Sequence, residues 1–188
     1  MKIFRALALS ATLLCFVPPL SAQPSDTSTL DKKDFVEYAN VRLTANLRSL
    51  SGEQKAALKE MIAAAQIMDG LFWRQAYGER ESLKSLTQDP DLLRYAEINY
   101  GPWDRLQGNR PFLPGVGEKP LGAQFYPADM TKEEFEASDL PNKTDLYSVV
   151  RRDTKGRLYA LPYSIAFGTE LEKAAEHLRK AAALVKEP

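Results

Sequence analysis

The sequence predicts an α+β fold that is mostly helical and carries one small antiparallel sheet. Two long stretches, at 58–72 and 171–185, repeat apolar residues at intervals of three and four. This spacing is typical of amphipathic helices. Two β-rich runs, at 146–152 and 157–162, flank the turn sequence D-T-K-G at 153–156. A glycine at the end of such a turn favours a β-hairpin.

The first 22 residues have the order of a secretory signal peptide. Lys2 and Arg5 give a positive start, an apolar run follows at 6–17, and small residues lead up to Ala22. We therefore expect export, with cleavage near Ala22 and a periplasmic or secreted mature chain. The one cysteine, Cys15, would leave with this signal, so the mature fold would have to be stabilised without disulfides.

The composition limits the partners of the mature chain. The sequence has 25 basic and 25 acidic residues and a formal net charge of zero, whereas nucleic-acid-binding domains usually carry a basic face. No segment after the signal is apolar enough to cross a bilayer. We therefore expect neither nucleic acid nor a membrane as a partner. We divide the mature chain into a flexible leader at 23–33 and a single α+β domain at 34–188.

Capping residues and apolar periods predict the helices of that domain. Ser51, followed three residues later by Gln54, has the sequence of a capping box and should begin the longest helix. The predicted helices are 34–50, the long helix from Ser51 to Gly78, 79–86, 91–98, a short helix capped by Thr131, and a last helix from about Thr169.

Residue types that catalysis requires are scarce in this chain. His177 is the single histidine, and Glu170, seven residues before it on the same predicted helix, could join it in a two-ligand cluster. Ordinary solvated helix charges explain this pair better, since a zinc site needs three or four ligands. A G-x-S-x-G elbow and a phosphate-binding glycine loop are also missing. We therefore predict no catalytic and no metal-binding residue, and the substrate-binding residues stay unknown.

An irregular stretch at 99–131 is the candidate binding region. Bulky aromatic residues alternate there with Gly and Pro, in neither the helix nor the strand period. They could line a groove for an extended peptide. Alternatively, they could pack against the helix at 58–72 and hold the loop in one shape, which is the commoner role of aromatics beside Gly and Pro. The candidates are Tyr100, Trp103, Phe112, Phe125 and Tyr126, with Asn99, Asp104 and Arg110 for polar contacts.

Three long segments carry a family resemblance. They read NYGPWDRLQGNRPF at 99–112, FYPADMTKEEF at 125–135 and LYSVVRRDTKGRLYALPYS at 146–164. Together with the helical N-terminal part and the amphipathic last helix, they resemble the N-terminal portion of bacterial dipeptidyl peptidase III family proteins, often called zinc-dependent hydrolases. The resemblance covers nearly the whole mature chain, but none of its motifs is catalytic.

This resemblance implies two lobes around a cleft, with zinc held in one lobe by an H-E-x-x-G-H helix and a downstream Glu. The present chain would supply much of the other lobe, which mixes helices with a small β-core and holds the peptide in extended form. The hairpin at 146–162 could belong to that β-core. The zinc helix, the third ligand and a substrate-binding E-x-Y segment would lie beyond Pro188, so no family catalytic residue can be assigned to a position here.

Two functional hypotheses follow. The leading one is an exported N-terminal lobe of a zinc-dependent peptidase-like hydrolase, truncated or split, that contributes fold and peptide-cleft wall and is inactive alone. Its partner would be a C-terminal zinc-bearing half or a peptide ligand, and zinc would be needed only in the complete protein. The alternative is a self-contained secreted binding module that keeps the lobe, has lost the chemistry and is not an enzyme.

Overall fold

The computed structural model describes residues 35, 38–141 and 143–185, so the predicted signal peptide at 1–22 and leader at 23–33 lie outside the described residues. The fold is α+β, as predicted, but it has two small antiparallel sheets, since the short pair β1-β2 accompanies the one predicted sheet. Its elements are α1 (Gly52–Ala76), the 3-10 turn η2 (Arg80–Ser82), α2 (Leu83–Leu86), α3 (Pro90–Asn99), β1 (Trp103–Asp104), β2 (Arg110–Pro111), α4 (Lys132–Ala137), β3 (Ser148–Arg152), β4 (Leu158–Pro162), α5 (Tyr163–Ala166) and α6 (Gly168–Leu184).

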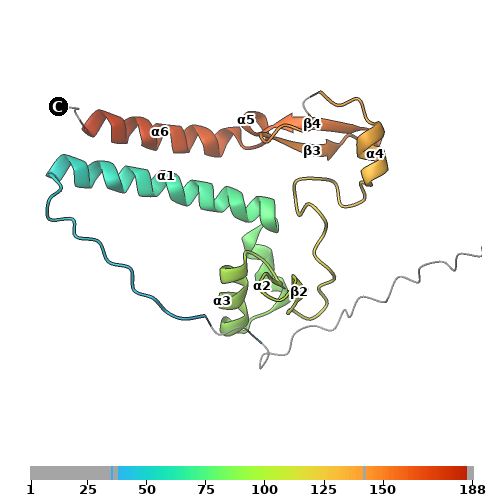
Figure 1. The fold of residues 1–188 in the computed structure, drawn as a ribbon, viewed down its shortest axis with the longest axis horizontal. Coiled ribbons are helices and arrows are strands. Elements are labelled where there is room, and N and C mark those ends of the chain that lie inside the picture. The colour runs from blue at the N-terminus through green and yellow to red at the C-terminus, as the bar shows by residue number, and fades with distance from the viewer. Residues whose placement is uncertain (1–34, 36–37, 142, 186–188) are drawn as a thin grey trace, which may run out of the picture.

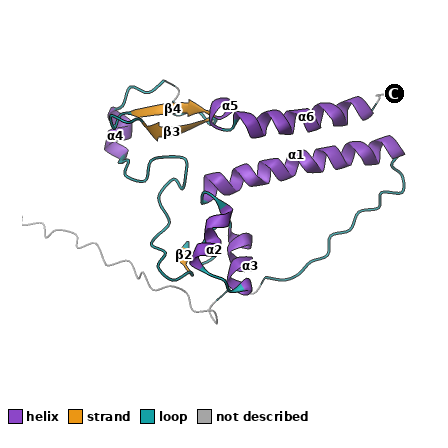
Figure 2. Cartoon of the chain, turned by 180° about the vertical axis from the view of Figure 1, so that it is seen from behind, coloured by secondary structure: helices purple, strands orange, loops and turns teal. Residues whose placement is uncertain are grey.

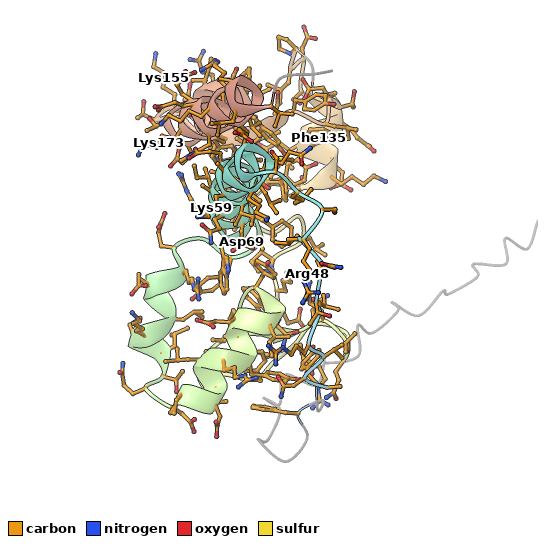
Figure 3. All side chains as sticks on the ribbon, turned by 90° about the vertical axis from the view of Figure 1, so that its left-hand side faces the viewer. Arg48, Lys59, Asp69, Phe135, Lys155 and Lys173 are labelled. Atoms are coloured by element: carbon orange, nitrogen blue, oxygen red, sulfur yellow. The ribbon has the colours of Figure 1, made fainter. Side chains whose placement is uncertain are left out.

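The two long helices, α1 and α6, lie side by side and run in opposite directions (Figures 1 and 2). Their contact uses small side chains, because Ala57 and Ala64 of α1 and Ala174 and Ala181 of α6 are all buried. Residues seven apart return to nearly the same face of a helix, so each alanine pair forms a flat strip along which two helices can approach closely. Figure 3 looks along this pair. Both predicted helices are confirmed.

The predicted capping box at the start of α1 is also confirmed. The Gln54 amide donates to Ser51 Oγ at 3.2 Å, and the Ser51 amide donates to Gln54 Oε1 at 2.9 Å. Each side chain thus satisfies a backbone amide that the first helical turn leaves without a partner.

The predicted helix at 34–50 is wrong for the described residues, since 38–47 have no regular secondary structure. Phe35 and Tyr38 pack on Tyr95 of α3, with ring centroids 4.3 and 5.8 Å apart. From there the chain must run back to the far end of α1 (Figure 1), a helix about 37 Å long at 1.5 Å per residue. The 13 residues at 38–50 would span about 20 Å as a helix but about 40 Å when extended, so only the extended form reaches.

Two hydrophobic clusters flank α1. The first gathers around Trp73 and holds α2, α3 and the start of the aromatic loop. The second gathers around Leu71 and holds the hairpin and the start of α6 through Val149 and Phe167. Residues two apart point to different sides of a helix, so α1 joins the two clusters through adjacent positions on its last turns. The buried members of the first cluster are Trp73, Leu83, Tyr95, Ala96, Phe112 and Leu113.

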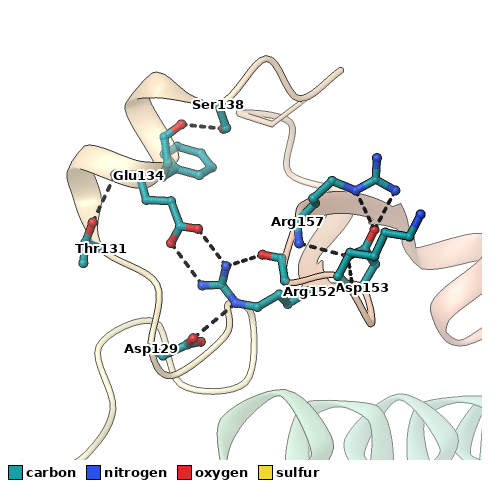
Figure 4. Close-up of polar contacts among 10 residues, drawn as sticks. Asp129, Thr131, Glu134, Ser138, Arg152, Asp153 and Arg157 are labelled. Atoms are coloured by element: carbon teal, nitrogen blue, oxygen red, sulfur yellow. Dashed lines mark hydrogen bonds and ion pairs between the residues drawn. The ribbon is translucent and has the colours of Figure 1, made fainter.

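The hairpin forms as predicted, with β3 and β4 antiparallel and Val150 opposite Ala160. Its turn places Gly156 at φ +80°, a left-handed conformation that glycine adopts without steric cost. The predicted short helix α4, capped by Thr131, is fastened to this hairpin by one guanidinium (Figure 4). Arg152 donates to both carboxylate oxygens of Glu134, at 2.7 and 3.0 Å, and its Nε lies 3.2 Å from Asp129 Oδ2.

Candidate functional site

The aromatic loop begins where α3 ends. Tyr100 takes a left-handed conformation, with φ +54°, which stops the helix and turns the ring toward α1. The ring contacts Phe72 and Trp73 at centroid distances of 4.7 and 5.2 Å, and the hydroxyl donates to Asp69 Oδ1 at 2.5 Å. This hydrogen bond to a carboxylate, followed by burial, raises the pKa of Tyr100. Tyr100 therefore docks the loop onto α1.

Asp104 is the polar centre of the loop and is fully buried. Its Oδ2 accepts from the Tyr95 hydroxyl at 2.6 Å, and its Oδ1 accepts from the Leu106 amide at 2.8 Å. Gln107 adds two longer bonds, both 3.2 Å, from its backbone and side-chain nitrogens. A buried carboxylate requires such partners, so its contacts are structural.

Asn99 is buried beside it, with 2% of its surface exposed. Its Nδ2 donates to the Tyr95 carbonyl at 3.0 Å, and its Oδ1 accepts from the Arg105 amide at 3.1 Å and from the Tyr38 hydroxyl at 3.4 Å. One side chain thus joins the extended segment, α3 and the loop. Both ends of the amide thus make hydrogen bonds within the protein.

Trp103 and Phe112 form the apolar part of the loop and are both buried. The Trp103 indole donates to the Gly117 carbonyl at 2.9 Å. Gly101, at φ +142°, lies so close to that ring that a Cβ would sit 3.2 Å from Trp103 Cε3. Phe112 packs edge-on against Tyr95 at 4.9 Å. These contacts hold the loop in one shape, but the aromatic partners of Trp103 and Phe112 are Tyr77 and Tyr95, which lie outside the predicted helix surface at 58–72.

Phe125 and Tyr126 lie at the other end of the loop, and each packs against a different part of the protein. Phe125 packs against the second cluster, and its carbonyl accepts from the Val150 amide of β3 at 2.9 Å. Tyr126 packs edge-on against Phe135 of α4 and remains 39% exposed. Phe125 therefore binds the loop to the hairpin, and Tyr126 is the most solvent-accessible of the five aromatic candidates.

The structure brings two of the eight candidates, Arg110 and Phe125, to one open groove with a volume of about 710 Å³. The groove runs between 108–111 and 118–123, so it is built from the loop's Gly- and Pro-rich turns. Lys119 lines it as well, and its ammonium lies 5.8 Å from the centre of the Trp103 ring. Burial, and to a lesser extent Arg105, lowers the pKa of Lys119.

Sequence reasoning missed Lys119 as a groove residue. The available signal was its position between Glu118 and Pro120 in an otherwise apolar turn region. The groove is lined by the charged residues Arg110, Lys119 and Glu118 and by apolar residues that include Phe125, so it presents charges of both signs beside apolar surface.

The two residues considered as metal ligands have separate partners. His177 Nδ1 lies 2.7 Å from Glu60 Oε2 on α1, and Glu170 Oε1 accepts from Arg74 at 2.7 Å. Within residues 35, 38–141 and 143–185, no three His, Cys, Asp or Glu side chains are grouped closely enough to hold a metal ion. The described residues therefore do not fit a zinc site. Among them, no helix is both long and apolar enough to span a membrane.

Fold and site together define an α+β module whose aromatic loop packs against α1 and α3 and lines an open groove. Comparison with solved structures gives this module a counterpart. The chain is similar to dipeptidyl-peptidase III from Corallococcus sp. strain EGB, with 38% identity and a TM-score of 0.73 over 79% of the chain. It is also similar to DPP III from Caldithrix abyssi, with 35% identity and a TM-score of 0.67 over 74% of the chain. The fold is therefore dipeptidyl peptidase III-like.

The matched region is a minor part of each similar protein. The chain covers 30% of the Corallococcus chain and 28% of the Caldithrix chain. Among curated proteins it is similar to Nudix hydrolase 3 of Arabidopsis thaliana, with 30% identity over 84% of this chain and 28% of the relative. No protein-family model matches the sequence.

Proposed function

We propose that this chain forms part of the non-zinc lobe of an exported, zinc-dependent hydrolase of the dipeptidyl peptidase III kind. In this role it supplies scaffold and a wall of the peptide cleft, while residues outside these 188 supply the zinc ligands and the catalytic groups. The observation that carries the proposal is the likeness to two dipeptidyl peptidase III structures at 35% and 38% identity. The name of the Arabidopsis relative denotes a different chemistry, but the chain spans 28% of that protein.

The cleft-wall role rests on the groove between 108–111 and 118–123. Its cation Lys119 suits a carbonyl oxygen or the carboxylate of a peptide, Glu118 suits a peptide amide or amino group, and Phe125 suits an apolar side chain. The loop beneath it is fixed by the buried Asp104 and Trp103. A rigid support of this kind keeps the entropic cost of binding low.

A chimera tests the proposal. Residues 23–188 of this chain replace the matching region of the Corallococcus enzyme, and hydrolysis of a fluorogenic dipeptidyl amide is measured together with zinc content. We expect a chimera that binds zinc and turns over the substrate. A folded, zinc-loaded chimera without turnover would contradict the proposal and favour the self-contained binding module. Zinc-dependent turnover by this chain alone would also contradict the proposal, because it would place the catalytic groups within these residues.

The groove is tested in the same chimera with Lys119→Ala and a matched control, Lys155→Ala, in the exposed hairpin turn. If the groove holds the substrate in the ground and transition states alike, Lys119→Ala raises KM about tenfold and leaves kcat unchanged. Lys155→Ala should change neither constant. Equal kinetics for both variants would remove the groove from the substrate path.

A further inference from the structure

The helix pair α1–α6 has two unlike flanks. On one flank, charged side chains join the helices, with Glu60 to His177 and Arg74 to Glu170, each at 2.7 Å. Lys59 and Lys173 project to one side of the pair when it is viewed along the helices (Figure 3). This side carries the polar residues that a solvent-facing flank requires.

The opposite flank is apolar and half-exposed. On α1, Met61, Ala65, Met68 and Phe72 follow one another at intervals of four, three and four, and the exposed fractions of the two methionines and Phe72 are 52%, 48% and 46%. On α6, Leu178 is 51% exposed, and the Val185 that follows the helix is 41% exposed. A monomeric surface seldom leaves so many large apolar side chains together in water.

The spacing of these apolar side chains suits a third helix packed against α1 and α6. The stripe on α1 has the three-and-four spacing of a helical seam, and two antiparallel helices present a groove that accepts the ridge of a third. The small Ala57–Ala64 and Ala174–Ala181 strips bring α1 and α6 close together. A third amphipathic helix can therefore contact both at once.

We propose that the apolar flank of α1 and α6 is the docking surface for an amphipathic helix from the remainder of a dipeptidyl peptidase III-like polypeptide. This inference rests on the proposed function, because the occupant is the complementary part of that protein. Its support is the length of the similar chains, of which these residues cover 28% and 30%. Their remaining length is ample to provide a helix that covers these exposed apolar side chains.

The probe is the Corallococcus dipeptidyl-peptidase III polypeptide from which the region matching this chain has been removed. It is tagged and co-expressed with the present chain, and complex formation is measured by size-exclusion chromatography and by titration of the purified parts. The test variants are Met68→Glu on α1 and Leu178→Glu on α6. The matched controls are Gln66→Glu and Ala183→Glu, which place the same charge at exposed positions of the same helices.

We expect the wild-type chain and both controls to bind the probe, and each test variant to bind at least tenfold more weakly. Circular dichroism verifies that each variant is folded. A second readout avoids substitution altogether: in the free chain, peroxide should oxidise Met61 and Met68, and the probe should protect both. Protection of neither methionine, or equal binding by controls and test variants, would overturn the proposal.

Two other outcomes assign the flank differently. If the free chain is a dimer that Met68→Glu dissociates, and the probe does not compete, the occupant is a second copy and the proposal is wrong. If wild-type chain and probe do not associate, the proposal is wrong as well. The chimera described above distinguishes this result from a failure of the proposed function. If the chimera is active but the separate chain and probe do not bind through the flank, only the docking surface is refuted.

Discussion

Replacing Asp104 with alanine tests whether a buried carboxylate holds the aromatic loop. The side chain is fully buried and accepts four hydrogen bonds, from Tyr95, from Leu106 and twice from Gln107. Asp104→Ala removes all four acceptor contacts and opens a small cavity between α3 and the loop. The backbone amides of Leu106 and Gln107 then lose the bonds that shape the turn after β1.

The expected cost follows from these contacts. A hydrogen bond to a charged group contributes about 1.5–3 kcal/mol net, and the four bonds share one carboxylate, so their contributions are not additive. Removing the shared acceptor leaves buried neutral donors without a partner, at about 1–3 kcal/mol each, and we expect a combined loss of about 3–5 kcal/mol in the free energy of unfolding. With a urea m-value of about 2 kcal/mol/M for a chain of this size, the midpoint should fall by about 2 M.

Urea unfolding followed by circular dichroism measures the loss. The matched control is Asp129→Ala, because Asp129 is also a paired carboxylate but its side chain is 71% exposed. Exposed ion pairs contribute about 0–1 kcal/mol, so this control should barely move the midpoint. If Asp104→Ala costs less than about 1 kcal/mol at an unchanged m-value, the reasoning from burial is refuted.

Three further predictions concern the hairpin, the groove and the start of α1. The hydrogen bond from Arg152 lowers the pKa of Glu134 below its ordinary value of 4.5; this stabilisation is present above that value and is lost as pH falls through the lowered pKa. Glu134→Gln should therefore reduce the urea midpoint near neutral pH, and the difference from wild type should shrink steadily as pH falls below 4.5. Gly122→Ala should destabilise the chain more than Gly108→Ala, since both glycines have positive φ but only at Gly122 would a Cβ meet Tyr126, 2.3 Å from Cδ2; equal urea midpoints for the two variants would show that Tyr126 simply moves away. Ser51→Ala should cost about 1 kcal/mol in urea unfolding, and Ser51→Asp should restore most of it because aspartate is also a good N-cap; a loss unrelieved by aspartate would assign the effect to something other than capping.

Local signals predicted the helices and the hairpin well because their stabilising contacts are close in sequence. The capping box of Ser51 and Gln54 lies within four residues, and the hairpin turn at 153–156 is set by a glycine that tolerates positive φ. The extended segment at 38–47 is the contrary case. Its apolar spacing fits a helix, but the distance between the first hydrophobic cluster and the start of α1 decides its conformation, and that distance is a property of the whole fold.

The candidate site shows the same division. The sequence indicated that the aromatic loop is held by packing or by a ligand, and Trp103 and Phe112 are buried in it, although against Tyr77 and Tyr95 and not against the helix surface that the spacing suggested. The sequence did not indicate which side chains share a groove. Arg110 and Lys119 line the same groove only because of the path that the loop takes between them. The exposed stripe of Met61 and Met68 also reads as ordinary core spacing, and only the fold distinguishes a buried apolar face from an open one.

Leu71 and Trp73, two residues apart on α1, couple the two hydrophobic clusters. Leu71 is fixed in the cluster that holds the hairpin and Trp73 in the cluster that holds the aromatic loop, and the Gln75 carbonyl of the same turn accepts from the Gln124 amide at 3.0 Å. Twisting α1 about its axis would strain both clusters together. Because both clusters are anchored on the same turns of α1, loosening of those turns would disturb the hairpin and the aromatic loop together.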